Sequence, residues 1–333
     1  MKLVSQRMGW LIGWMAAVSA AAVPEPGKDA EVSDLGLVLK WVPPGVCQLG
    51  SSPFEQKWTE GPEGQGNRKW FANEGQSLAV FETGFWMGRT EVTVAQWQQF
   101  VAATGYITDG ERQGFAWGFD GDRKTLANVP GANWRRPTYG LPQRPDHPVS
   151  CVSWNDAMAF CDWLTAREAA AGRLPEDYEY RLPGDAEWEY ACRGRQWDTR
   201  FWWGNDVSDG AGRINAASDD AVVPGDPAWR WNNPFPWSDG YGFISPVDAY
   251  GERGRNGFGL ADMLGNLWEW CYDGYDHKGA HARIYQKGTA NRLLRGGAFD
   301  DRPAFLRCAV RQAPTPAESN FARGFRVCLG PPP

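Results

Sequence analysis

The sequence predicts one α+β domain in which regular secondary structure is sparse and loops are long. Its 333 residues include 40 glycines, 24 prolines and 20 tryptophans. Glycine and proline favour turns and interrupt helices and strands, whereas tryptophan supplies large apolar surfaces for a core. No internal repeat or low-complexity linker divides the chain, so we expect residues 23–333 to form a single domain.

The N-terminal residues are typical of a secretory signal. Lys2 and Arg7 precede an apolar run, Met8–Val18, and small residues follow it up to Pro24. The alternative is a transmembrane anchor, but the run is shorter than the roughly 20 apolar residues that cross a bilayer. We therefore expect a signal peptide at residues 1–22 that is cleaved, no stable membrane anchor, and a secreted or periplasmic protein.

The charge balance argues against nucleic acid as a partner. The formal net charge is −6, and the basic residues form no stripe of the kind that binds phosphate backbones. A mildly acidic surface mainly favours solubility. The oligomeric state is not predicted by any feature of the sequence.

Three helices are predicted from capping residues and from apolar residues that share one face. The first has the spacing of a capping box at its start and a glycine at its end. The third has a proline in its first turn, followed by acidic residues that favour the positive end of a helix. The boundary residues are Thr93 and Gly105, Ser153 and Arg167, and Pro183 and Gly194.

The remaining segments alternate between short strands and irregular stretches. Leu35–Val46 reads as a strand, a turn at its Pro-Pro-Gly, and the start of a second strand, and Ser77–Met87 as a further strand. Ser52–Glu74 is polar and glycine-rich, which predicts an exposed loop. Thr108–Pro145 and Phe201–Arg255 show no clear period and are predicted to be irregular.

Seven cysteines are present, and secretion would place them in an oxidising compartment. Several are therefore expected to form disulfides, and the odd number leaves at least one thiol unpaired. No close Cys-x-x-Cys pair occurs, so a structural zinc site is not expected. The cysteines are Cys47, Cys151, Cys161, Cys192, Cys271, Cys308 and Cys328.

A series of short motifs extends along the whole mature chain. It runs Trp41–Gly45, Phe85–Thr93, Pro148–Trp154, Tyr180–Ala191, Gly265–Trp270, Arg295–Gly297 and Gly324–Val327. In their order and joint presence these motifs resemble the formylglycine-generating-enzyme family, also called the sulfatase-modifying-factor family. The resemblance implies a variant of the C-type-lectin-like fold, with little regular structure and with bound calcium.

The same resemblance implies two calcium sites, and calcium is bound by about six to eight oxygens. The first would use the side chains of Asp262 and Glu269 and the carbonyls of Gly265 and Leu267. The second would use the side chains of Asn215 and Asp239 and the carbonyls of Ala216 and Tyr241. The alternative is that these are ordinary turn and cap residues.

The resemblance also implies two disulfides. They are Cys161–Cys328 and Cys192–Cys308, which would tie the C-terminal segment to two of the predicted helices. Each closes a long loop and would contribute a few kcal/mol. A Cys151–Cys271 bridge that leaves Cys47 free is an alternative that spacing does not decide.

Copper is not expected. Family members that convert a sulfatase cysteine to formylglycine bind copper through two cysteines shortly after the Arg-Gly-Gly motif, and copper(I) prefers such soft thiolate ligands. Here no cysteine lies between Gly297 and Cys308, and Ala298 and Phe299 replace a serine and a tryptophan that are common there. The sequence therefore predicts calcium but not copper and leaves the catalytic residues unassigned.

Iron is used by other relatives, whose ligating histidines lie largely in a separate helical domain that is not visible in this chain. Of the three histidines, His277 and His281 are four residues apart and would share a helical face. Asp276 and Gly279 beside them favour a loop instead, so an iron site is not the expected outcome.

Two classes of function follow from the C-terminal segment. One is a protein like formylglycine-generating enzyme that acts on a protein or peptide, with a sulfatase among the candidate partners. The other is a non-catalytic lectin-like module that uses this segment as its recognition surface. The candidate ligand-binding residues are Trp268, Asp300, Asp301, Arg302, Arg307 and Arg311. For these residues the alternative is a structural role in the core and in salt bridges.

Overall fold

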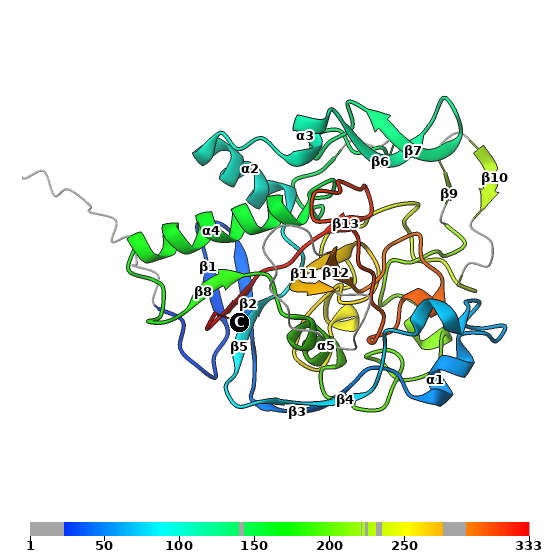
Figure 1. Cartoon of the computed structure of the whole chain (residues 1–333), viewed down its shortest axis with the longest axis horizontal. Coiled ribbons are helices and arrows are strands. Elements are labelled where there is room, and N and C mark those ends of the chain that lie inside the picture. The colour runs from blue at the N-terminus through cyan, green and yellow to red at the C-terminus, as the bar shows by residue number, and fades with distance from the viewer. Residues whose placement is uncertain are drawn as a thin grey trace, which may run out of the picture.

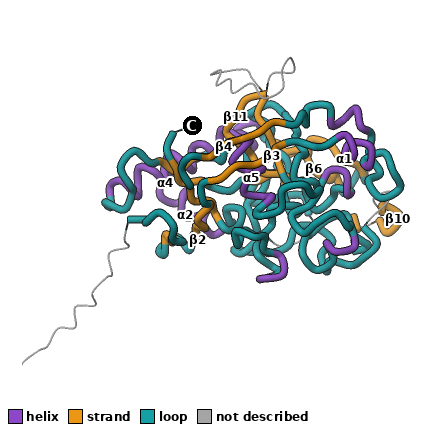
Figure 2. The backbone as a smooth tube through the Cα atoms, turned by 90° about the horizontal axis from the view of Figure 1, so that it is seen from below, coloured by secondary structure: helices purple, strands orange, loops and turns teal. Residues whose placement is uncertain are grey.

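The computed structural model describes residues 23–139, 143–220, 222–223, 226–230, 235–275 and 291–332. It confirms an α+β arrangement with long loops, which make up most of the trace in Figure 2. The predicted signal peptide, His277 and His281 lie outside these residues. Within them, no helix is both long and apolar enough to cross a membrane.

The helices and strands are short and widely spaced along the chain. The helices are α1 Pro53–Trp58, α2 Val94–Thr104, α3 Asp109–Gln113, α4 Trp154–Ala170 and α5 Asp185–Arg193, with 3-10 turns at Arg68–Phe71, Ser208–Gly210, Gly251–Gly254 and Pro303–Phe305. The strands are β1 Ala30–Val32, β2 Leu37–Val42, β3 Gly45–Leu49, β4 Ser77–Phe81, β5 Phe85–Gly88, β6 Phe115–Asp120, β7 Thr125–Pro130, β8 Glu179–Arg181, β9 Val222–Val223, β10 Asp226–Arg230, β11 Trp268–Tyr275, β12 Asn291–Arg295, β13 Arg323–Gly324 and β14 Cys328–Gly330.

Strands from both ends of the domain share the largest sheet. Its order is β1-β2-β5-β14-β8, and every neighbouring pair is antiparallel. Because β14 lies between β5 and β8, the end of the chain is held inside the sheet, where Figure 1 places the C-terminus. A second sheet, β12-β11-β13, occupies the middle of the molecule, and β3–β4, β6–β7 and β9–β10 form separate two-stranded ribbons.

All three helices predicted from capping residues are confirmed. In α2 the Thr93 hydroxyl accepts a hydrogen bond from the Gln96 amide at 3.3 Å, and the Gln96 side chain accepts one from the Thr93 amide at 2.9 Å. Gly105 ends α2 in the left-handed region with φ +67. Ser153 and Asp156 form the same kind of capping box at the start of α4.

The predicted exposed loop at Ser52–Glu74 is wrong in part. It contains α1 and a 3-10 turn, and Glu55, Phe71 and Glu74 are buried. The two carboxylates are buried because both pair with Arg307, which follows them by more than two hundred residues. Because the arginine partner is distant in the sequence, these buried carboxylates cannot be distinguished there from those of a solvent-exposed loop.

Two other segments are more regular than predicted. Thr108–Pro145, which the sequence predicts to be irregular, contains α3 and the β6–β7 hairpin, whose strands pair from Phe115–Pro130 to Asp120–Thr125. Ser77–Met87 is two strands rather than one, and they belong to different sheets. Likewise β2 and β3, on either side of the Pro-Pro-Gly turn, do not pair with each other.

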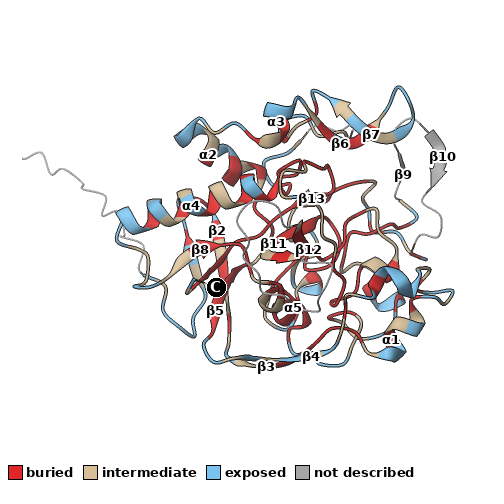
Figure 3. Ribbon diagram, viewed as in Figure 1, coloured by how far each residue is buried: buried red, intermediate tan, exposed pale blue. Residues whose placement is uncertain are grey.

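The core consists of two groups of buried apolar side chains, and burial is concentrated in the middle of the molecule (Figure 3). Aromatic rings provide much of the contact. Trp97 of α2 stacks on Phe160 of α4 at 5.8 Å between centroids, and Phe325 packs edge-on against both rings. Such pairs stabilise the fold beyond the area that they bury.

The C-terminal segment is also anchored by buried arginines. Arg295 has no exposed side-chain surface and donates to Asp185 Oδ1 at 2.6 Å and to Glu189 Oε2 at 2.9 Å. Its Nη1 also reaches the carbonyls of Cys308 and Val310, each at 3.1 Å. Arg295 therefore joins β12, α5 and the last loop through one guanidinium group.

We expect Arg295→Met to lower the free energy of unfolding by about 3–5 kcal/mol, because it leaves buried carboxylates without their partner. Urea denaturation at pH 7 measures the change. Arg144→Met, which removes an exposed pair with Asp146, is the control and should have little effect. An equal loss in the two variants would contradict the anchoring role.

Candidate functional site

The Arg-Gly-Gly motif turns the chain out of β12 into the candidate ligand-binding segment, residues 298–307. Gly297 has φ +74, and a Cβ added there would lie 2.5 Å from Leu306 Cδ2 and 2.7 Å from the Phe305 carbonyl. Glycine is therefore required both for the backbone angle and for the close approach. The two ends of the segment pack directly against each other at this point.

Two adjacent carboxyl groups, Asp300 and Asp301, stand where the segment begins. The Ala298 amide donates to Asp301 Oδ2 at 2.9 Å, and the Asp301 amide donates back to the Ala298 carbonyl at 3.0 Å. Arg302 donates to the Gln65 carbonyl at 2.9 Å. Asp300, Asp301 and Arg302 are residues of intermediate exposure, so each meets solvent over part of its surface, although the two carboxyl groups lie deep enough for burial to shift their pKa.

The two carboxyl groups favour the protonated state more than ordinary aspartates do. Burial raises the pKa of Asp300 to about 6, against the opposing charge of Arg323. Burial and then the charge of Asp300 raise the pKa of Asp301 well above its usual range, although a hydrogen bond with Trp268 opposes the shift. Close carboxyl groups shift in this way because both cannot ionise at low cost.

Aromatic side chains form the base of the segment. Phe299 is 1% exposed and packs against Tyr139, Phe243 and Phe321 at centroid distances of 5.9, 5.6 and 5.5 Å. Trp268 is 4% exposed, so it supports the acid pair from beneath and offers little surface of its own. Of the predicted ligand-binding residues, Trp268 and Asp300–Arg302 thus come together in one place.

Arg307 and Arg311 do not join this group at the surface. Arg307 is fully buried and pairs with Glu55 and Glu74 at 2.7 and 2.8 Å. Arg311 is 5% exposed and pairs with Asp185 at 2.9 Å. For these two residues the geometry favours the structural role that the sequence left open.

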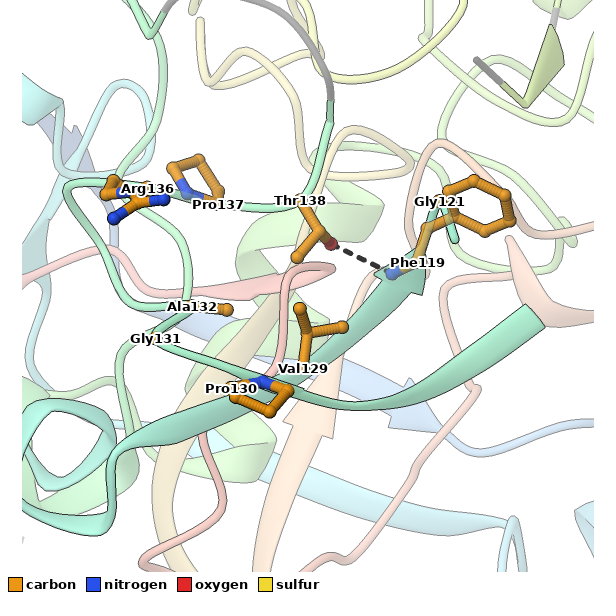
Figure 4. Close-up of a pocket in the computed structure, with 9 residues that line it drawn as sticks. All are labelled: Phe119, Gly121, Val129, Pro130, Gly131, Ala132, Arg136, Pro137 and Thr138. Atoms are coloured by element: carbon orange, nitrogen blue, oxygen red, sulfur yellow. Dashed lines mark hydrogen bonds between the residues drawn. The ribbon is translucent and has the colours of Figure 1, made fainter. Parts of the chain in front are cut away.

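The described cavities lie elsewhere. A cavity of about 290 Å³ opens beside the β6–β7 hairpin and is lined by Phe119, Val129, Arg136 and Thr138 among others (Figure 4). The Phe119 amide donates to Thr138 Oγ1 at 2.9 Å across one side of it. Another of similar volume lies near Phe81 and Glu187. Neither is lined by a predicted ligand-binding residue.

The residues of the first predicted calcium site lie in one buried region, but Glu269 is already engaged there. Its two carboxylate oxygens accept from Arg326, each at 2.6 Å, and one also accepts from Trp188 Nε1 at 2.7 Å. Asp262 Oδ2 accepts from the Asp248 amide at 2.6 Å. Glu269 would have to leave these partners to bind a metal, so the first site stays a prediction.

The residues of the second predicted calcium site fit a cation better. Asn215 Oδ1 is buried and has no hydrogen-bond partner. The Asp239 carboxylate accepts from the Ala216 and Tyr241 amides, both at 2.9 Å, and burial raises its pKa to about 6. The Ala216 amide connects the Asp239 carboxylate to the residue that follows Asn215, and an amide oxygen without a partner and a carboxylate are both hard oxygen donors of the kind that calcium prefers.

Sequence reasoning missed Glu91. It is fully buried, its Oε1 accepts from Asn266 Nδ2 at 3.1 Å, and its Oε2 has no partner. Burial, then Asp262 and Glu269, raise its pKa well above the usual range. No signal marks it in the sequence, where it is one charge in a strand-to-helix turn. In the ranges that the structure describes, no three His, Cys, Asp or Glu side chains are placed to hold a metal together.

All seven cysteines are buried thiols in the structure. Cys192 Sγ lies 3.5 Å from Cys308 Sγ, so the predicted partners are in contact. For the other predicted pair, burial raises the pKa of Cys161 well above its usual range, and neighbouring Asp162 and Cys328 raise it further. Cys47 lies in the same apolar group as Cys192 and Cys308. Both disulfides stay predictions.

The fold has clear counterparts among solved structures. PvdO from Pseudomonas aeruginosa superposes with a TM-score of 0.64 at 22% identity, covering 92% of this chain and 99% of that one. Treponema denticola variable protein 1 superposes with a TM-score of 0.58 at 19% identity, covering 91% and 99%. These likenesses confirm the predicted C-type-lectin-like class of fold.

The sequence identifies the family. The model of the sulfatase-modifying factor enzyme 1-like domain matches residues 35–330. The formylglycine-generating enzymes of Bos taurus and Streptomyces coelicolor are 35% and 34% identical, over 76% and 94% of this chain and 67% and 95% of their own. An inactive C-alpha-formylglycine-generating enzyme 2 of Mus musculus is 28% identical over 80% of both chains. The chain belongs to the sulfatase-modifying-factor, or formylglycine-generating-enzyme, family.

The acid pair predicts a pH-dependent effect of Asp300→Asn. Between the ordinary value of 3.8 and the folded pKa of about 6, the native state holds more protons than the unfolded one, so stability falls as pH rises. Asparagine avoids that cost. We expect the variant to be more stable than wild type by about 1–2 kcal/mol above pH 6, after allowance for partial exposure, and equal to it below about pH 4.

Urea denaturation across this pH range measures the difference. Asp122→Asn, in the exposed turn of the β6–β7 hairpin, is the control and should show no such trend. A difference between Asp300→Asn and wild type that stays the same at every pH would contradict the assignment.

Proposed function

We propose that the mature chain is a secreted or periplasmic, calcium-stabilised member of the family that binds a polypeptide at residues 298–307 and does not generate formylglycine with copper. The sequence match to the family and the lectin-like fold support the proposal that calcium stabilises the protein. The proposal for the ligand follows from Asp300–Arg302, three charged residues of intermediate exposure next to the buried Trp268 and Phe299.

The observation that carries this proposal is that the segment contains two carboxylates and no thiol. Between Gly297 and Cys308 the chain offers Asp300 and Asp301 and no cysteine. Carboxylate oxygens are hard donors, whereas copper(I) is held by soft thiolates. Cys308 itself is buried and in contact with Cys192, so it does not replace the missing ligands.

Calcium fits this chain at Asn215 and Asp239. When bound, the ion would supply a divalent charge and satisfy the Asn215 oxygen. The chain's own residues position the donor groups: the Ala216 and Tyr241 amides donate to the Asp239 carboxylate and orient it. The Tyr250 hydroxyl donates to the Asp239 carbonyl at 3.2 Å and fixes the turn.

Ligand binding would use charge and hydrogen bonding rather than a deep cavity. The raised pKa values of Asp300 and Asp301 allow the pair to donate as well as accept a hydrogen bond near neutral pH. A peptide group offers both a hydrogen-bond donor and an acceptor to the two carboxyl groups. A basic side chain would favour full ionisation of Asp300 and Asp301. A sulfatase segment is one candidate of this chemistry, and other polypeptides fit it as well.

The second candidate is oxidation of a cysteine in a protein substrate. The 35% identity to the Bos taurus formylglycine-generating enzyme favours it. The inactive Mus musculus relative is 28% identical, so resemblance to this family alone does not decide activity.

The two candidates differ in copper content and turnover. We expect the purified mature protein to hold no stoichiometric copper after loading and desalting, and to convert no cysteine peptide to the aldehyde above the blank. The Streptomyces coelicolor relative, treated in the same way, is the positive control. Aldehyde formation with one bound copper per chain would overturn the proposal.

The proposed disulfides are Cys161–Cys328 and Cys192–Cys308. Mass spectrometry of proteolytic peptides, prepared without reduction from protein secreted into an oxidising compartment, should find both bridges. Recovery of Cys308 bonded to Cys47 instead would show that the third thiol in the cluster has displaced Cys192.

A further inference from the structure

The geometry points to Asn215 as a positioning residue that couples calcium binding to the conformation of residues 298–307. This inference rests on the proposed function, because it takes calcium to bind at Asn215 and Asp239 and a ligand to bind at Asp300–Arg302. It goes further because calcium binding would then control ligand binding. No contact between calcium and the ligand is required.

The Asn215 amide is held in one orientation. Its Nδ2 donates to the Phe243 carbonyl at 2.7 Å and to Asn266 Oδ1 at 3.1 Å. Both hydrogens of the amide nitrogen are therefore used, and the plane of the group is fixed. Its Oδ1 is left buried, without a partner. A bound cation would satisfy this oxygen without disturbing the other two bonds.

The first connection from Asn215 to the ligand-binding segment is made by Ala217, two residues further along the chain. The Ala217 amide donates to the Asp301 carbonyl at 3.2 Å. The Ala217 carbonyl in turn accepts from the Phe235 amide at 2.6 Å. Any change in the backbone at Asn215 and Ala216 is thereby passed to Asp301.

A second route runs through Asn266. The Asn266 amide donates to the Asn215 carbonyl at 2.9 Å, and the Asn266 carbonyl accepts from the Phe299 amide at 3.0 Å. Gly265 lies so close that an added Cβ would be 2.1 Å from the Asn215 carbonyl oxygen. The loop at Asn215 is therefore linked to the segment on both sides of Asp300, directly at Asp301 and through Asn266 at Phe299.

Without a cation, the fixed Asn215 oxygen is a buried polar atom without a partner, which destabilises the local backbone. A cation that binds the ordered loop shifts the population towards it, and the same bonds then order Phe299–Asp301. By reciprocity, a ligand that orders the segment strengthens calcium binding by the same factor.

Hydrogen–deuterium exchange of the mature protein, with calcium alone as the probe, tests the coupling. On chelation, amides in peptides covering residues 213–219 and 297–306 should exchange at least about fivefold faster. Peptides covering α2 should not change. Asn215→Ala in calcium should reproduce the chelated pattern at 297–306 and lose its response to calcium, whereas Asn128→Ala, at an exposed position of β7, should respond as wild type does.

If Asn215→Ala does not fold, the wild type alone decides the matter through a calcium titration. Protection at 213–219 and at 297–306 must then rise with the same midpoint, and different midpoints overturn the coupling. Calcium that binds and raises the melting temperature but protects only residues 213–241 overturns the coupling and leaves the proposed function standing. Failure to bind any calcium overturns both.

Discussion

The fold depends on three arginines that have no exposed side-chain surface, Arg295, Arg307 and Arg326. A guanidinium group taken out of water is costly unless carboxylates and carbonyls surround it. Each of these arginines comes from the C-terminal part of the chain. Each meets carboxylates from another segment: Asp185 and Glu189 on α5, Glu55 and Glu74 in the N-terminal part, and Glu269 on β11. The charge pairs therefore specify how the last part of the chain is placed, in a protein whose helices and strands are too short to do so alone.

This arrangement explains which structural features the sequence could predict. Local signals sufficed for α2 and α4, because Thr93 and Ser153 form their capping boxes with residues three positions away. The prediction of an exposed loop at Ser52–Glu74 is wrong in part because Glu55 and Glu74 are buried against Arg307, a partner that no local pattern reveals. The pairing of β3 with β4 rather than with β2 also has no local signal, and the chain just after β3 is held by a distant residue, because Arg193 of α5 donates to the Gly50 carbonyl at 2.9 Å.

The candidate site was predictable to a similar extent. The order of the motifs located the C-terminal segment, and the sequence alone shows that no cysteine lies between Gly297 and Cys308. The division of the six candidates into a surface group and a buried group was not, because Arg302 and Arg307 look alike in the sequence and differ only in whether carboxylates enclose them. Glu91 was missed for the same reason, since its burial beside Asp262 arises from a contact between distant segments.

A scaffold of this kind can keep its shape while its chemistry changes. Residues 298–307 are anchored by the arginine network and the Gly297 turn, together with the hydrogen bond from the Ala298 amide to the Asp301 carboxylate. Because no cysteine lies between Gly297 and Cys308, the segment lacks soft ligands for copper(I) while these anchors remain. A family whose members include both formylglycine-generating and inactive proteins is consistent with such a change.

The most direct test of this account is a crystal structure of the mature protein, loaded with calcium and copper and measured on both sides of the copper absorption edge. We predict a calcium ion bound to Asn215 Oδ1 and Asp239 at about 2.3–2.6 Å, and no copper signal near Asp300 and Asp301. A copper ion at that pair, with no ion at Asn215, would contradict the account.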